Sequence, residues 1–131
     1  EFRRVLFRST EISMPIFNLV INHGQSPRNA SYAYIVVPGI NHPEKMKTYS
    51  CRHLKIERND TEIQAVNNRK SGILQIVFFK PGTFDNEEIK VKALKPCVVQ
   101  IKRSKGKVTD MQIADPQNQE KLKPGVDVII L

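Results

Sequence analysis

The sequence predicts an all-β fold built from antiparallel strands. From Thr10 onward, short apolar or alternating runs recur along the chain, and turn residues separate them at the spacing typical of a β-sandwich. A single segment, by contrast, has the pattern of a helix. These observations favour packed β-sheets over a helical architecture.

The first expected strands are IFNLVI (16–21) and SYAYIVV (31–37). In the second run Tyr32, Tyr34 and Val36 fall on one face, and other apolar residues fall on the opposite face. Because both faces are apolar, we expect this strand to be buried between two layers.

A short helix is expected after the second strand. Pro43 suits the first helical turn, Asn41 or His42 precedes it as the cap, and residues 44–49 continue the helix. We expect one or two turns that connect layers or domains.

A second set of strands follows the helix. Its expected members are HLKIER (53–58), EIQAVNN (62–68), GILQIVFF (72–79), EIKVKAL (88–94), CVVQIKR (97–103), KVTDMQIA (107–114) and VDVIIL (126–131). Turn residues mark the connections at 59–60, 69–72, 80–82 and 104–106. The last of these is predicted to be a tight hairpin tip.

Neither end of the chain has the pattern of a natural terminus. The nonapeptide EFRRVLFRS (1–9) is encoded by a codon string that resembles a sequencing adapter, so we predict that it is not native and exclude it from the fold. The chain stops at VIIL, an apolar run without a polar cap. Because exposed apolar strands aggregate, we expect the last domain to be truncated.

The composition is that of a soluble globular domain, with 40% hydrophobic residues, 26% charged residues and a net charge of +8. Without residues 1–9, 18 basic and 12 acidic residues remain, so the chain stays basic at +6. This charge favours an anionic partner: nucleic acid, acidic polysaccharide or anionic lipid. No apolar run approaches the roughly 20 residues of a membrane-spanning helix. Cys51 and Cys97 have neither zinc-ligand spacing nor the number for a disulfide framework. A single bridge between them is the alternative, and two buried thiols are expected.

His23 with Tyr32 or Tyr34 is a candidate acid–base pair. Proton abstraction next to a carboxylate also needs a group that neutralises the carboxylate, and Arg28 is the nearby candidate. The alternative, which we favour, is a histidine fixed in a turn beside tyrosines that pack in a sandwich.

No metal site is expected, because the three histidines match no ligand spacing. Asp110 and Asp115 could contribute to a calcium site, but that site would need several more converging oxygens. The segment ADPQN (114–118) favours a turn in which the aspartate caps the backbone.

Lys102, Arg103, Lys105 and Lys107 are predicted to form a basic hairpin tip. One interpretation is a contact to a polyanion, and the other is a solvated turn. Nucleic-acid binding would need aromatic residues among the basic ones for base stacking, or a recognition helix, and neither is expected here. An acidic polysaccharide therefore fits the tip better than a nucleic acid.

The spaced motif HG-x-x-P-x-x-A-x-Y-x-Y-x-x-x-P carries a family resemblance. Its residues are His23, Gly24, Pro27, Ala30, Tyr32, Tyr34 and Pro38. The motif resembles the last strands of the central β-supersandwich of polysaccharide lyase family eight, which includes chondroitin AC and ABC, hyaluronate and xanthan lyases. The segments 63–68, 77–84 and 95–118 resemble, in the same order, parts of the small C-terminal β-sandwich of that family.

The resemblance implies the end of a large antiparallel β-supersandwich at 10–49 and a small C-terminal β-sandwich at 50–131. It implies a bacterial, secreted or periplasmic lyase that cleaves uronate polymers such as chondroitin sulfate or hyaluronan by β-elimination, without a cofactor. In that family the catalytic residues lie in an N-terminal α/α-toroid domain, which no part of this chain matches. We therefore assign no catalytic residue, treat the motif residues as scaffold, and expect the fragment alone to be inactive.

Two other functions remain as alternatives. A free-standing carbohydrate-binding module would begin with a signal peptide shortly before Thr10 and would bind glycosaminoglycans by itself. A nucleic-acid-binding module would prefer DNA to chondroitin sulfate at moderate salt.

Overall fold

The computed structural model describes residues 15–131 with the exception of residues 17 and 120. The predicted non-native nonapeptide lies outside the described residues. The chain divides into two compact units, Glu1–Tyr32 and Ala33–Leu131. Among the described residues, no helix is both long and apolar enough to cross a membrane.

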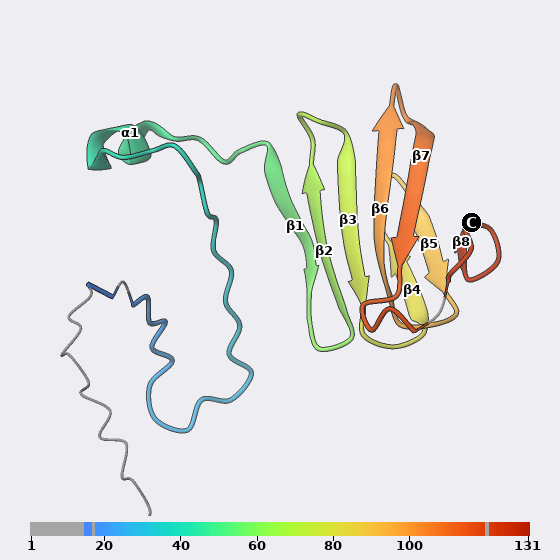
Figure 1. Ribbon diagram of the computed structural model, residues 1–131, viewed down its shortest axis with the longest axis horizontal. Coiled ribbons are helices and arrows are strands. Elements are labelled where there is room, and N and C mark those ends of the chain that lie inside the picture. The colour runs from blue at the N-terminus through green and yellow to red at the C-terminus, as the bar shows by residue number, and fades with distance from the viewer. Residues whose placement is uncertain (1–14, 17, 120) are drawn as a thin grey trace, which may run out of the picture. The chain divides into compact units, whose positions relative to one another are not determined.

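The second unit contains two antiparallel sheets (Figure 1). The five-stranded sheet has the order β1-β2-β3-β6-β7, and the three-stranded sheet has the order β4-β5-β8. The strands are β1 (Leu54–Asn59), β2 (Ile63–Asn68), β3 (Ile73–Phe78), β4 (Gly82–Asp85), β5 (Lys90–Ala93), β6 (Cys97–Ser104), β7 (Lys107–Ala114) and β8 (Val128–Ile130).

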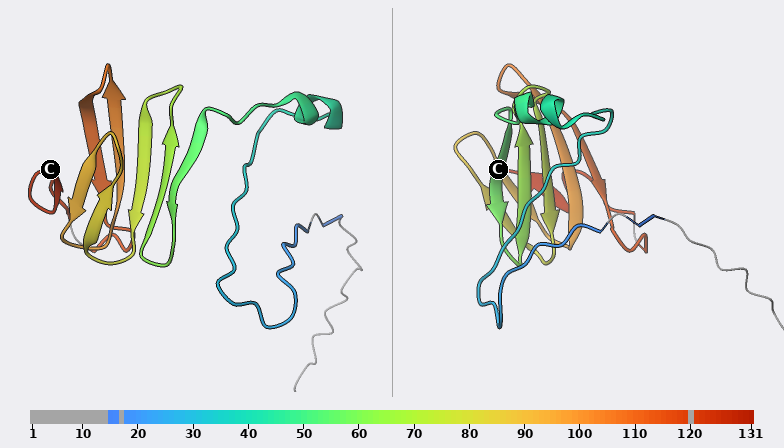
Figure 2. Two further views of the ribbon diagram at one scale, coloured as in Figure 1. Left: turned by 180° about the vertical axis from the view of Figure 1, so that it is seen from behind. Right: turned by 90° about the vertical axis from the view of Figure 1, so that its left-hand side faces the viewer.

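The hydrophobic core lies between these two sheets. Seen from behind in Figure 2, the yellow strands of the small sheet lie over the orange strands of the large one. Alternate residues point inward, so β3 contributes Leu74, Ile76 and Phe78, which are at most 1% exposed. The small sheet contributes Phe84 and Val91 in return. Two polar-out, apolar-in faces packed against each other make a β-sandwich.

Most of the expected elements of this unit are confirmed. The helix α1 (Pro43–Thr48) begins with proline after the cap residue His42. The tip between β6 and β7 is a two-residue turn in which Lys105 and Gly106 both have positive φ, as a tight hairpin requires. Strand β4 was not predicted, because its four residues GTFD follow directly on the Lys80–Pro81 turn.

The two expected strands at 16–21 and 31–37 are wrong for the described residues, which contain no strand there. The expected burial of 31–37 is also wrong, since Tyr32, Tyr34 and Val36 are 63%, 64% and 76% exposed. A strand is held by ladder hydrogen bonds to a neighbouring strand. Both sheets of the described chain consist of β1–β8 alone, so these two segments have no ladder partner in them.

The two cysteines differ from each other. Cys97 is buried in the core, as expected, whereas Cys51 is exposed, which corrects the expectation of two buried thiols. Cys51 precedes β1 and therefore lies outside the sandwich interior. Both thiols are free.

Candidate functional site

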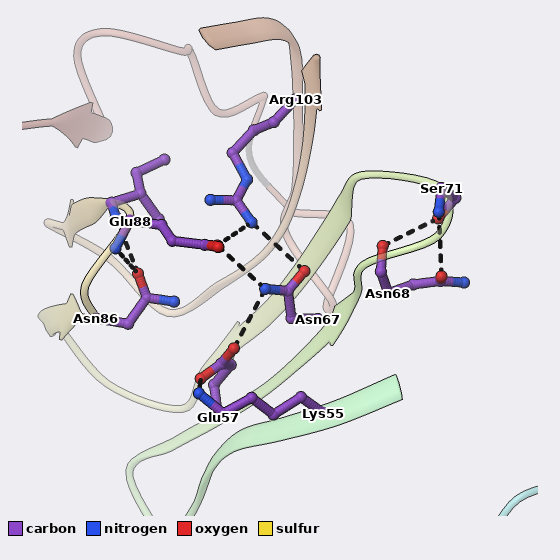
Figure 3. A network of polar contacts seen from close by, with 9 residues as sticks. Lys55, Glu57, Asn67, Asn68, Ser71, Asn86, Glu88 and Arg103 are labelled. Atoms are coloured by element: carbon purple, nitrogen blue, oxygen red, sulfur yellow. Dashed lines mark hydrogen bonds and ion pairs between the residues drawn. The ribbon is translucent and has the colours of Figure 1, made fainter. Parts of the chain in front are cut away.

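A cluster of polar side chains replaces apolar packing at one end of the sandwich (Figure 3). We call Glu57, Asn67, Glu88 and Arg103 the polar cluster. It lies at the end that carries the β2–β3 and β6–β7 turns, at the top of Figure 1. The hydrophobic core between the two sheets ends where these four side chains begin.

Asn67 is the centre of the polar cluster. It continues the inward face of β2 after Ile63 and Ala65, and it is 1% exposed. Its Nδ2 donates to Glu57 Oε1 at 3.2 Å and to Glu88 Oε2 at 3.3 Å, and its Oδ1 accepts from Arg103 Nη2 at 3.4 Å. These bonds satisfy a buried amide that would otherwise be costly.

A β-bulge turns Glu57 toward Asn67. The register of β1 against β2 shifts between Ile56 and Arg58, so Glu57 is an extra residue without its own partner. A bulge re-aims the side chains around it. The Glu57 side chain is only 6% exposed, and Lys55 forms an ion pair with it at 2.6 Å.

Arg103 joins the two sheets. It continues the inward face of β6 after Val99 and Ile101, and its Nη2 lies 2.6 Å from Oε2 of Glu88, which is in the β4–β5 connection of the other sheet. The guanidinium beside Glu88 holds the pKa of that carboxyl below its usual value of 4.5. The buried Nε–H of Arg103 has no hydrogen-bond partner, so the guanidinium is only partly satisfied.

A pocket of about 460 Å³ opens beside the polar cluster. Its lining consists of Asn67, Arg69, Gly72, Glu88, Arg103, Lys105 and Gly106. The β2–β3 turn, the β6–β7 turn and the β4–β5 connection thus form its walls. This volume lies within the range of small-molecule sites, which is about 300–1,000 Å³.

Glycine is required at one position of this wall. Gly72 has a φ of +67°, and a Cβ there would lie 2.3 Å from the carbonyl oxygen of Arg103. The backbone N–H of Arg103 donates to the Gly72 carbonyl at 2.8 Å. The close approach of these two backbones fixes the β2–β3 turn against β6.

The four basic residues of the predicted tip are not equivalent. Lys102, Lys105 and Lys107 are exposed, but the Arg103 side chain is 12% exposed and turned inward to Glu88. Lys102 lies opposite Asp110 in the β6–β7 ladder, and Lys105 lines the pocket. The tip therefore presents lysines to solvent, with the arginine committed to the interior.

The scaffold motif residues lie in or near the first unit. His23 and Tyr32 have ring centroids 6.3 Å apart, with the rings tilted by 44°. The backbone N–H of Gly24 donates to Asn22 Oδ1 at 2.8 Å, and Gly24 has a φ of +79°. These residues form a local turn, and their assignment as scaffold stays a prediction.

The expected turn at Asp115 is present. Its carboxylate accepts from the backbone N–H groups of Gln117 and Gln119, each at 2.9 Å. Across the described part of the chain, no group of three or more histidine, cysteine, aspartate or glutamate side chains could hold a metal ion.

Sequence reasoning missed Asn67, Glu57, Glu88 and Arg69 as members of a site. Asn67 and Arg103 carried a readable signal, because each continues the inward face of its strand at the two-residue period. Glu57 carried none, because the bulge that turns it inward depends on pairing with β2.

Comparison with known proteins places the chain in a family. The family model described as "Polysaccharide lyase family 8, super-sandwich domain" matches residues 5–50, and "Polysaccharide lyase family 8, C-terminal beta-sandwich domain" matches residues 55–123. Chondroitinase-AC of Pedobacter heparinus is 41% identical over 85% of this chain, and hyaluronate lyase of Thermasporomyces composti is 29% identical over 82%.

A solved structure agrees with these matches. The chain is similar to chondroitinase AC lyase, solved as enzyme–oligosaccharide complexes, with a TM-score of 0.60 and 40% identity over 72% of this chain. The chain spans only 16% and 13% of the two relatives and 14% of the solved chain. It therefore corresponds to a small part of such an enzyme. The chain belongs to polysaccharide lyase family 8, comprising the end of the super-sandwich domain and the C-terminal β-sandwich domain.

Proposed function

We propose that this chain is the non-catalytic C-terminal part of a bacterial, secreted or periplasmic lyase that cleaves uronate polysaccharides of the chondroitin or hyaluronan type by β-elimination. The observation that carries the proposal is the 41% identity with chondroitinase-AC over 85% of the chain. The catalytic residues would lie in an α/α-toroid domain elsewhere in the same protein.

The part played by the chain itself is support of the enzyme and contact to the acidic polymer. The net charge of +6 that remains without residues 1–9 supports the second role, because a basic surface raises the local concentration of a polyanion. Lys102, Lys105 and Lys107 are exposed at the β6–β7 turn and available for such a contact. Arg103 acts differently, since it is held by Glu88.

The genomic DNA upstream of Thr10 tests the assignment. We expect an open reading frame that runs back through more β-strand sequence into an α-helical toroid domain. A start codon and signal peptide just before Thr10 would instead indicate a free-standing carbohydrate-binding module.

The division of labour is tested with the parent enzyme and the chain side by side on chondroitin sulfate and hyaluronan. The parent should release unsaturated uronate products, detected by their ultraviolet absorbance, and the chain alone should release none. Cleavage by the chain alone would overturn the non-catalytic assignment.

A further inference from the structure

We propose that the pocket beside the polar cluster is a binding site for one acidic sugar unit, meaning a ring that carries a carboxylate or a sulfate together with free hydroxyl groups. This inference rests on the proposed function, because it names the place where the C-terminal sandwich would contact the acidic polymer.

The charge of the lining selects an anion. Arg69, Arg103 and Lys105 line the pocket against a single carboxylate, that of Glu88. Within the described part of the chain, no acidic residue forms an ion pair with Arg69 or Lys105. The charge of Lys105 is therefore available to a ligand. Arg69 acts on Glu88 at longer range, where it helps to lower the pKa of that carboxyl, and its N–H donors remain open to a ligand. Hydrogen bonds between such cations and an acidic group are stronger than neutral ones.

The mixture of donors and an acceptor favours a sugar over a bare anion. The Glu88 side chain is 52% exposed, so part of it can accept hydrogen bonds from sugar hydroxyl groups while the cations contact the acidic group. A nucleobase would need an aromatic surface for stacking, and the lining contains no aromatic residue.

The walls of the pocket are held in place before any ligand binds. Arg69 follows Asn68, whose Oδ1 accepts from the backbone N–H of Ser71 at 3.2 Å. The backbone N–H of Arg69 donates to the backbone carbonyl oxygen of His53 at 2.8 Å. On the facing wall, Arg103 is fixed by Glu88 and Asn67. Rigid walls reduce the ordering cost of binding.

Two matched double variants of the full chain test the proposal. Arg69→Gln with Lys105→Gln changes the pocket, and Lys102→Gln with Lys107→Gln removes the same charge from the rest of the hairpin. All four positions are exposed, so both variants should retain the circular dichroism spectrum and melting temperature of the unaltered chain. Binding is measured by calorimetry with chondroitin sulfate hexasaccharide, hyaluronan hexasaccharide, neutral maltohexaose and inorganic sulfate.

The pocket variant should weaken binding of the acidic hexasaccharides by about tenfold or more, since it removes two charged contacts. The hairpin variant should weaken it by less than about threefold, because Lys102 and Lys107 lie outside the pocket and any contact they make with the polymer is exposed and screened. Hyaluronan carries only carboxylates, so its comparison with chondroitin sulfate identifies which acidic group binds.

Equal losses in the two variants, or a larger loss in the hairpin variant, would overturn the pocket and leave the lyase assignment standing. Equal binding of maltohexaose or of sulfate alone would overturn the acidic-sugar class. No binding by the unaltered chain would overturn the site as well, whereas the lyase assignment fails only if the parent enzyme cleaves neither polymer.

Discussion

The two ends of one sandwich interior are built from different chemistry. Along most of β3 and β6 the facing sheets are joined by apolar side chains such as Leu74, Ile76 and Val99, each fully buried. At the end near the β2–β3 and β6–β7 turns they are joined by Asn67, Glu88 and Arg103. Apolar burial supplies stability without directional requirements, while a polar cluster needs every partner in place. The apolar part therefore holds the sheets together, and the polar end positions groups that a ligand can reach.

The largest expected effect is the loss of apolar packing at Phe84. This residue is 1% exposed and is contributed by β4 of the small sheet. Phe84→Ala should lower the free energy of unfolding by about 3–5 kcal/mol, measured by urea denaturation. The control is Phe79→Ala, because Phe79 is 52% exposed and should cost less than about 1 kcal/mol. Similar losses at both positions would mean that the two sheets are not packed as described.

Removal of Arg103 should cost less. Arg103→Met removes the guanidinium that donates to Glu88 and to the Oδ1 of Asn67, while Asn67 Nδ2 still donates to Glu88. We expect the free energy of unfolding to fall by about 1–2 kcal/mol, because half of the Glu88 side chain already faces water. Lys102→Met, one residue away and exposed, serves as the control and should change stability by less than about 0.5 kcal/mol. A double-mutant cycle that combines Arg103→Met with Glu88→Gln measures the coupling energy of this ion pair. A coupling energy of zero would contradict an Arg103–Glu88 link between the two sheets.

A smaller effect is expected in the pH dependence of stability. The pKa of Glu88 is lowered by Arg103 in the folded protein, so its contribution is present above the unfolded value of 4.5 and is lost as the pH falls through the lower folded value. The melting temperature of the unaltered chain should therefore fall more steeply than that of Glu88→Gln below about pH 4.5. Parallel curves for the two proteins between neutral and acid pH would contradict this assignment.

The two cysteines test whether the apolar part of the sandwich is closed to solvent. Burial raises the pKa of the Cys97 thiol to about 11, with Asp127 adding to the shift, whereas Cys51 is exposed. A thiol reagent at neutral pH should modify Cys51 rapidly in the folded chain and Cys97 only after denaturation, because the thiolate is the reactive form. Counting modified thiols by mass spectrometry checks this, and rapid modification of both would show that the core is open to solvent.

The sequence predicted most strands of the sandwich because their apolar faces repeat with a period of two and turn residues separate them. The same period is a signal that could have placed Asn67 and Arg103 on inward faces, but Asn67 was missed and Arg103 was predicted to belong to the hairpin tip. The bulge at Glu57 and the position of Glu88 could not be predicted, since both depend on which strands pair. The run at 31–37 is predominantly apolar, like several of the observed strands. An apolar pattern does not supply the neighbouring strand that a ladder requires.

The decisive measurement is a titration of the full chain with hyaluronan hexasaccharide, followed by the backbone amide signals in nuclear magnetic resonance spectra. We predict shifts at Arg69, Gly72, Lys105 and Gly106, which line the pocket. The amides of Asp60 and Glu62, at the opposite end of β2, should not move. Shifts at that opposite end, with the pocket amides unchanged, would contradict a ligand-binding role for the polar end of the sandwich.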